Sequence, residues 1–249
     1  ALRWVALDSD ADLLRAPIAA NRWTSVNDFI AHAEYFIAPM QNLVVADRNG
    51  QIALMSPGRV PVRGPQHDLK GLVPAPGWDA RYDWVGFLPV QQLPQELNPA
   101  RGWAGSANQR IHGPDYPHFI ASDWAPPFRM QRIAELIDAK PKHDLASLRD
   151  IQRDEVSLAA RRLLPYLKNA NSNHPLAAAA QRELHGFDGH MAADRAAPLI
   201  YWAWLRHLTQ ALLADDLGQV LYDRHVGWRN FREAVDGILE RNDAGWCDD

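Results

Sequence analysis

The sequence changes character at DWAPPFR, residues 123–129. Before this segment, short runs typical of β-strands are separated by loops rich in glycine and proline, whereas after it apolar residues recur at helical spacing. Adjacent prolines suit the first turn of a helix, where their missing N–H groups have no intrahelical partner to lose. The sequence therefore predicts an α+β chain, strand- and loop-rich over residues 1–127 and mainly helical over 128–249.

The first part contains a helix start and a hairpin. Ser25 is a good N-cap for a helix over residues 26–36, with Asp28 at the third helical position. The runs 42–46 and 51–55 flank DRNG, residues 47–50, and Asn-Gly accepts the positive φ of a tight turn cheaply. These signals predict a β-hairpin after the helix. Two further strands are expected over 82–88 and 106–112.

The second part shows repeated helical periodicity. The predicted helices span residues 128–139, 145–153, 156–167, 176–185, 196–214 and 228–240.

Composition excludes several classes of protein. The chain has 249 residues, of which 47% are hydrophobic and 22% charged, which is typical of a packed globular protein. Its formal net charge is -4, so nucleic-acid binding is not expected. The longest apolar stretch, residues 196–213, is interrupted by polar and charged residues, and no membrane span is expected.

Metal and thiol chemistry have weak local signals. His185, Asp188 and His190 could hold a metal ion, but the intervening glycines favour a simple turn at the end of a helix. Cys247 could be a nucleophile, but no base is placed near it in sequence, which favours a structural or unpaired thiol. No metal site is predicted.

A set of short segments together resembles the penicillin acylase (penicillin amidase) family of N-terminal-nucleophile hydrolases, within the β chain of those enzymes. Supporting matches run nearly the length of the chain. The central segments are NP at 98–99, Gly102, ANQ at 107–109, YP at 116–117, DWAPPFR at 123–129 and RI at 132–133. The supporting segments are ALRW at 1–4, ALD at 6–8, QN at 41–42, AD at 46–47, Gly50, GW at 77–78, WVG at 84–86, LP at 88–89, Gln152, Asp154 and LLP at 163–165.

The resemblance implies part of an αββα N-terminal-nucleophile hydrolase core followed by a helical region. In that family a serine freed at the start of the β chain by autoproteolysis is the nucleophile. Residue 1 here is Ala, so the resemblance predicts an internal fragment of a β chain, with an α chain and the remainder of the β chain as partners.

The resemblance assigns roles to four residues. Asn108 matches the asparagine whose side chain donates to the oxyanion, whereas the residues alone would suggest an asparagine in a turn. Arg129 matches an arginine near the active centre; its alternative is a solvated arginine in a first helical turn. Met40 and Gln41 fall where the family lines its acyl pocket.

The same resemblance implies a function and a location. The expected reaction is hydrolysis of a linear N-acyl amide, either a β-lactam side-chain amide or the acyl amide of a homoserine lactone, in the periplasm or outside the cell. The penicillin G enzymes use calcium through an aspartate shortly after a Tyr-Pro pair. Here YP is followed by HFI, residues 118–120, so no cofactor is predicted. The alternative is a non-catalytic structural or binding module.

Overall fold

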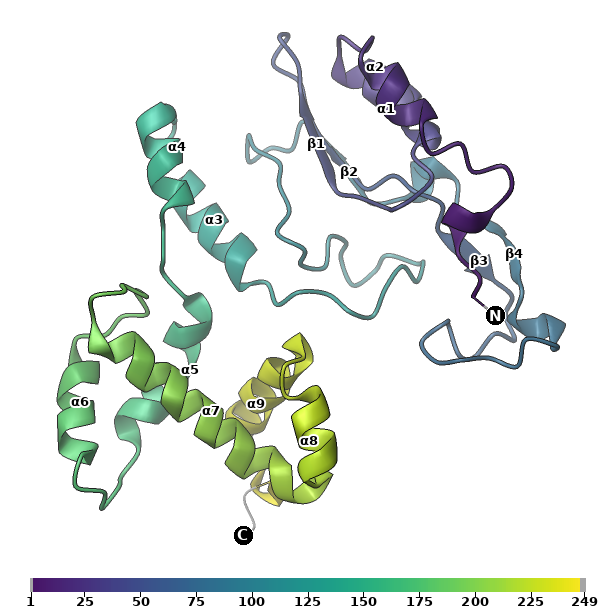
Figure 1. The fold of residues 1–249 in the computed structure, drawn as a ribbon. Helices are drawn as coiled ribbons and strands as arrows, with labels where there is room; N and C mark the ends of the chain where they lie inside the picture. The colour runs from purple at the N-terminus through teal and green to yellow at the C-terminus, as the bar shows by residue number, and fades with distance from the viewer. Residues whose placement is uncertain (1, 247–249) are drawn as a thin grey trace. The chain divides into compact units, whose positions relative to one another are not determined.

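The fold was analysed in a computed structural model that describes residues 2–246 (Figure 1). The chain forms two compact units, Ala1–Trp124 and Ala125–Asp249. The sequence places the boundary after Pro127, in the same proline-containing segment. Cys247, for which the sequence favours a structural or unpaired thiol, lies outside the described residues.

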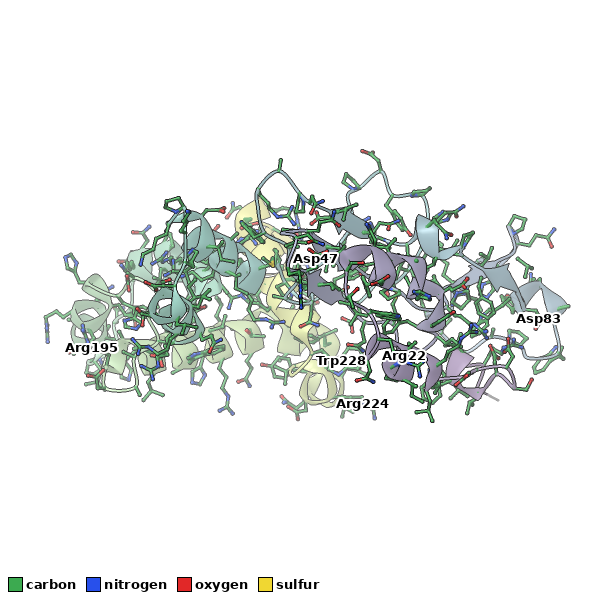
Figure 2. The ribbon with its side chains drawn as sticks, turned by 90° about the horizontal axis from the view of Figure 1, so that it is seen from above. Arg22, Asp47, Asp83, Arg195, Arg224 and Trp228 are labelled. Carbon is green, nitrogen blue, oxygen red and sulfur yellow. The ribbon has the colours of Figure 1, made fainter. Side chains whose placement is uncertain are left out.

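The first unit contains a three-stranded antiparallel sheet with the order β1-β2-β5. Strands β1 (Leu43–Ala46) and β2 (Ile52–Met55) form the predicted hairpin, and β5 (Gln95–Leu97) pairs with the other edge of β2. In the turn, Asp47, which is labelled in Figure 2, accepts hydrogen bonds from the backbone N–H groups of Asn49 at 2.8 Å and Gln51 at 3.2 Å. Gly50 has φ +81°. The hairpin prediction is confirmed, because its turn chemistry is local in sequence.

A second, two-stranded sheet joins β3 (Pro61–Arg63) to β4 (Trp84–Phe87). Strand β4 confirms the strand predicted over 82–88. The strand predicted over 106–112 is wrong, because this segment is an irregular loop. Side chains of Ser106 and Gln109 accept hydrogen bonds from nearby backbone N–H groups, which replaces strand pairing with local turns.

Two short helices, α1 (Arg15–Ala20) and α2 (Val26–Ala31), lie beside the first sheet (Figure 1). Ser25 caps α2 as predicted, and Asp28 completes a reciprocal capping box. The helix ends at Ala31 instead of residue 36, because the backbone of His32 leaves helical geometry and a 3₁₀ turn follows. Phe29 of α2 packs with Met55 of β2, which joins helix and sheet in one small core.

The described residues of the second unit form helices joined by loops, with one isolated antiparallel β-bridge between Val156 and His190. Five predicted helices match the structure within a few residues at each end, and α7 continues three residues beyond its predicted end, whereas α8 was not predicted. The helices are α3 (Phe128–Asp138), α4 (Leu145–Gln152), α5 (Leu158–Asn169), α6 (Ala177–His185), α7 (Ala196–Leu217), α8 (Gln219–His225) and α9 (Arg229–Arg241).

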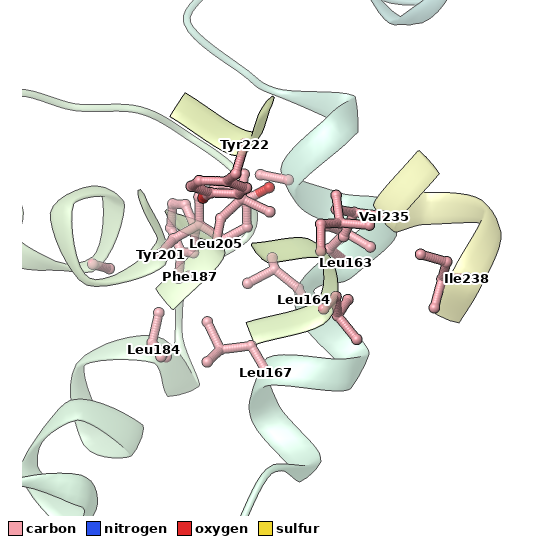
Figure 3. Close-up of a cluster of buried hydrophobic side chains, with 14 residues drawn as sticks. Leu163, Leu164, Leu167, Leu184, Phe187, Tyr201, Leu205, Tyr222, Val235 and Ile238 are labelled. Atoms are coloured by element: carbon pink, nitrogen blue, oxygen red, sulfur yellow. The ribbon is translucent and has the colours of Figure 1, made fainter. Parts of the chain in front are cut away.

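The core of the second unit lies between α5, α7 and α9 (Figure 3). Leu163 of α5 and Val235 of α9 are completely buried, and Tyr201 of α7 is 1% exposed. None of the helices among the described residues is long and apolar enough to span a bilayer.

A buried charge network joins three helices beside this core. Asp236 of α9 is 2% exposed and accepts a 2.7 Å hydrogen bond from Nε of Arg232. Arg232 also donates to the hydroxyl of Tyr201 at 3.0 Å and to the carbonyl oxygen of Ala159. The second carboxylate oxygen of Asp236 makes no hydrogen bond, although Arg162 lies 3.9 Å away. The buried carboxylate therefore depends mainly on Arg232.

Candidate active site

Asn108 lies in the irregular loop after β5, in a left-handed backbone conformation with φ +69°. Asparagine adopts this conformation more readily than most residues. Its backbone N–H donates to Oγ of Ser106 at 3.3 Å, and the N–H of Ala107 donates to the side-chain oxygen of Gln109 at 2.8 Å. These bonds fix the loop, and Asn108 stands at an exposed position on it.

The loop is tied to the hairpin sheet by a chain of side-chain hydrogen bonds. Ser56, which directly follows β2 and is 1% exposed, donates from Oγ to the side-chain oxygen of Asn42 at 2.6 Å. The side-chain amide of Asn42 donates to Oγ of Ser106 at 2.9 Å. The buried end of β2 thus sets the position of the Asn108 loop.

Met40 and Gln41 immediately precede Asn42 in this network. Met40 is partly buried against Gly58, where an added Cβ would lie 2.8 Å from the Met40 Cβ. Gln41 is exposed. The structure therefore brings the two predicted pocket residues to the same hydrogen-bonded region as the Asn108 loop.

Arg129 belongs to the second unit, whereas Asn108 belongs to the first, and each is placed within its own unit. Arg129 is an exposed residue in the first turn of α3, which begins after the two prolines as predicted. It lines a groove of about 510 Å³ formed by α3, the end of α4 and the start of α5.

A second arginine, Arg132, lines the same groove and is held by carboxylates. It donates to Asp154 at 3.0 and 2.6 Å and to Glu135 at 2.9 Å. Asp154 also accepts from the N–H of Val156 at 3.1 Å. The Arg132 guanidinium lowers the pKa of Asp154, and the carboxylates raise the pKa of Arg132. The carboxylates therefore fix the orientation of Arg132.

Replacing Asp154 with a neutral side chain should show how much the Arg132–Asp154 pair contributes to the free energy of unfolding. Asp154→Asn should lower the free energy of unfolding by about 1–2 kcal/mol at pH 6, because it removes a charge-assisted pair from a mostly buried site. The folded-state pKa of Asp154 is below its ordinary 3.8, so the stabilisation is present above pH 3.8 and disappears as pH falls through the folded-state value. Urea unfolding at several pH values measures both effects.

The control for this substitution is Asp150→Asn on the neighbouring helix, where the side chain is exposed and its contact with Arg149 is 3.5 Å long. It should leave the unfolding free energy nearly unchanged. An equal loss in both variants, or a loss in Asp154→Asn that does not shrink in acid, would contradict a specific role for the Arg132 pair.

Among the described residues, no group of three His, Cys, Asp or Glu side chains is arranged to hold a metal ion.

The whole chain, residues 1–249, matches the family model described as penicillin amidase. The chain belongs to the penicillin amidase family. One relative is the acyl-homoserine lactone acylase QuiP of Pseudomonas aeruginosa. It is 32% identical to this chain over 265 aligned residues, which cover 98% of this chain and 30% of that protein. Another is the penicillin acylase 2 proenzyme of a Pseudomonas species, 32% identical across 70% of this chain and 22% of that protein.

The penicillin amidase fold is also seen in a solved structure. The thermostable penicillin G acylase of Alcaligenes faecalis is 19% identical and aligns with a TM-score of 0.71, covering 88% of this chain and 40% of that one. This supports the predicted α+β hydrolase fold. The chain spans less than a third of the length of the curated relatives named above.

Arg132 and Asp154 both occur in the segments that resemble the penicillin amidase family, but the sequence assigns a role to neither residue. They are 22 residues apart, Arg132 in α3 and Asp154 in the segment between α4 and α5, so no local periodicity pairs them. The same holds for Asn42 and Ser106, which are 64 residues apart. Long-range pairs of this kind become visible only in the folded chain.

Proposed function

We propose that the protein to which this chain belongs hydrolyses a linear N-acyl amide, releasing a carboxylic acid and an amine. The observation that carries the proposal is the family match over residues 1–249, together with relatives named acylases. Two substrate classes follow from those names: N-acyl homoserine lactones and the side-chain amides of penicillins.

The proposed nucleophile is a serine at the amino terminus of a processed β chain, outside residues 1–249. Its α-amino group serves as the base, because such groups have ordinary pKa values of about 7.7–8.0. The serine oxygen attacks the amide carbonyl carbon, and the carbonyl oxygen becomes an oxyanion. The C–N bond then breaks, the amine leaves with the proton, and water hydrolyses the resulting ester. No step requires a cofactor.

In this proposal Asn108 donates its side-chain N–H to the oxyanion. The donor is needed where charge appears only in the transition state, and it is most effective when held in place beforehand. The fixed loop around Asn108 and its connection through Ser106 and Asn42 to β2 support this role.

Arg129 is proposed to orient Asn108 and the transition state, and Met40 with Gln41 to contact the acyl chain. The position of Met40 beside the hydrogen-bonded region supports the second assignment, and an unbranched thioether adapts well to flexible acyl chains. A periplasmic or secreted location is part of the same proposal, as is assembly with an α chain and the rest of the β chain.

The first experiment is intact mass measurement with amino-terminal sequencing of the protein made from its full-length gene. Two chains, the larger beginning with serine, are the expected result. These should then be assayed with an N-acyl homoserine lactone and with a penicillin, because pocket shape and not catalytic type separates the two. A single unprocessed chain without amidase activity would overturn the proposal and support a binding or structural module.

A further inference from the structure

The first unit contains a cavity of about 310 Å³ that the proposed amide chemistry does not use. It is formed by strand β3, the loop that follows it and the segment 117–119. Four of its lining side chains are basic: Arg63, His67, Lys70 and His118. No lining residue carries a carboxylate, and the rest of the wall is made largely of proline and other apolar side chains.

The cationic side chain of Arg63 is the feature that points to a ligand. Its Nε is buried and has no hydrogen-bond partner, and no carboxylate among residues 2–246 lies within ion-pair distance of the guanidinium. Burial lowers the pKa of Arg63, as expected for a cation without a compensating charge. Arg63 is half-buried, and its buried Nε is left without a partner, so an anion at this site would be favourable.

The loop after β3 holds further donors beside Arg63. His67 is 8% exposed, and its Nδ1 accepts a 3.1 Å hydrogen bond from the backbone N–H of Lys70, so the ring proton is on Nε2. The Lys70 ammonium lies 5.6 Å from the ring centre of Phe119.

Gly71 allows the loop to approach Arg63 closely. It has φ +77°, and an added Cβ would lie 2.8 Å from a terminal nitrogen of Arg63. The loop is therefore shaped to sit directly against the guanidinium.

We propose that this cavity binds a carboxylate group. A carboxylate matches the planar fork of an arginine and satisfies several donors at once, while the apolar wall suits the carbon atoms attached to it. The carboxylate can come from two sources. One is a small free organic acid, and the other is an Asp or Glu side chain from the part of the longer protein outside residues 1–249.

The experiment compares Lys70→Glu with Arg22→Glu in the full-length protein. Both residues are exposed cations of the first unit. Lys70 lines the cavity, whereas Arg22, which is labelled in Figure 2, does not. Each variant and the parent are titrated with butanoate and with its neutral analogue butanamide, and their thermal unfolding midpoints are measured without ligand. Arg63→Gln is the second variant, since it removes the charge but keeps a hydrogen-bond donor.

If a free acid is the occupant, butanoate should bind more tightly than butanamide. Lys70→Glu and Arg63→Gln should each lower the affinity for butanoate about ten-fold or more. If a protein side chain is the occupant, butanoate should not bind. Lys70→Glu should then lower the unfolding midpoint by several degrees while Arg22→Glu does not. Equal binding of the two compounds, or no binding with equal midpoints for the two charge reversals, would overturn the proposal.

Discussion

Replacing Asn108 with alanine should lower kcat of the full-length enzyme by about 10²–10³, with a much smaller effect on KM. The reason is that an oxyanion donor binds charge that exists in the transition state and not in the bound substrate. Steady-state kinetics with whichever amide the enzyme hydrolyses would measure the effect. Intact mass must first establish that the variant is processed like the parent, because an unprocessed chain has no free nucleophile.

Because of the backbone conformation at residue 108, Asn108→Ala needs a second variant, Asn108→Gly, as its control. The φ of +69° at this residue is strained for alanine, whereas glycine adopts this conformation without penalty. Asn108→Gly therefore removes the amide and preserves the loop, and it should lose as much activity as Asn108→Ala. If the glycine variant retains parental kcat, the loss in the alanine variant is conformational and the oxyanion role is wrong.

Replacing Asp236 with alanine should lower the free energy of unfolding by about 3–5 kcal/mol. The substitution leaves the Arg232 guanidinium between α5, α7 and α9 without its carboxylate partner. Urea denaturation followed by circular dichroism, which reports the helical unit, would measure the loss.

Two comparisons separate this effect from general sensitivity of the helices. Asp194→Ala, at an exposed site before α7, should change the unfolding free energy by less than about 0.5 kcal/mol. The double variant Arg232→Met with Asp236→Leu should be more stable than Asp236→Ala, because no unpaired buried charge remains. A double variant that is no more stable than the single one would contradict the charge explanation.

The elements predicted correctly from the sequence are those whose signals are local. The 43–55 hairpin follows from its Asn-Gly turn, and α2 begins where Ser25 and Asp28 form a capping box. Strands β3 and β5 were missed, because each has three residues and exists through pairing with a distant partner. The strand predicted at 106–112 is wrong because hydrogen bonds between side chains and the backbone determine the shape of this segment.

The candidate site was less accessible to sequence reasoning than the fold. Local pattern alone favours a turn asparagine at position 108, and this is the conformation observed. Only the family resemblance gives that residue a chemical role. The neighbours that hold it, Asn42 and Ser106, were not predicted because their contact spans 64 residues.

The contact between α5 and α9 has a consequence for the order in which the second unit folds during synthesis. Arg162 of α5 pairs with Glu240, and Ala159 accepts from Arg232, so contacts 73–78 residues apart complete the core. Leu163 and Val235 meet in the same place (Figure 3). On the ribosome, the part of the α5 surface that packs against α9 therefore stays uncovered until α9 has emerged. During that interval the nascent chain exposes a surface suited to chaperone capture.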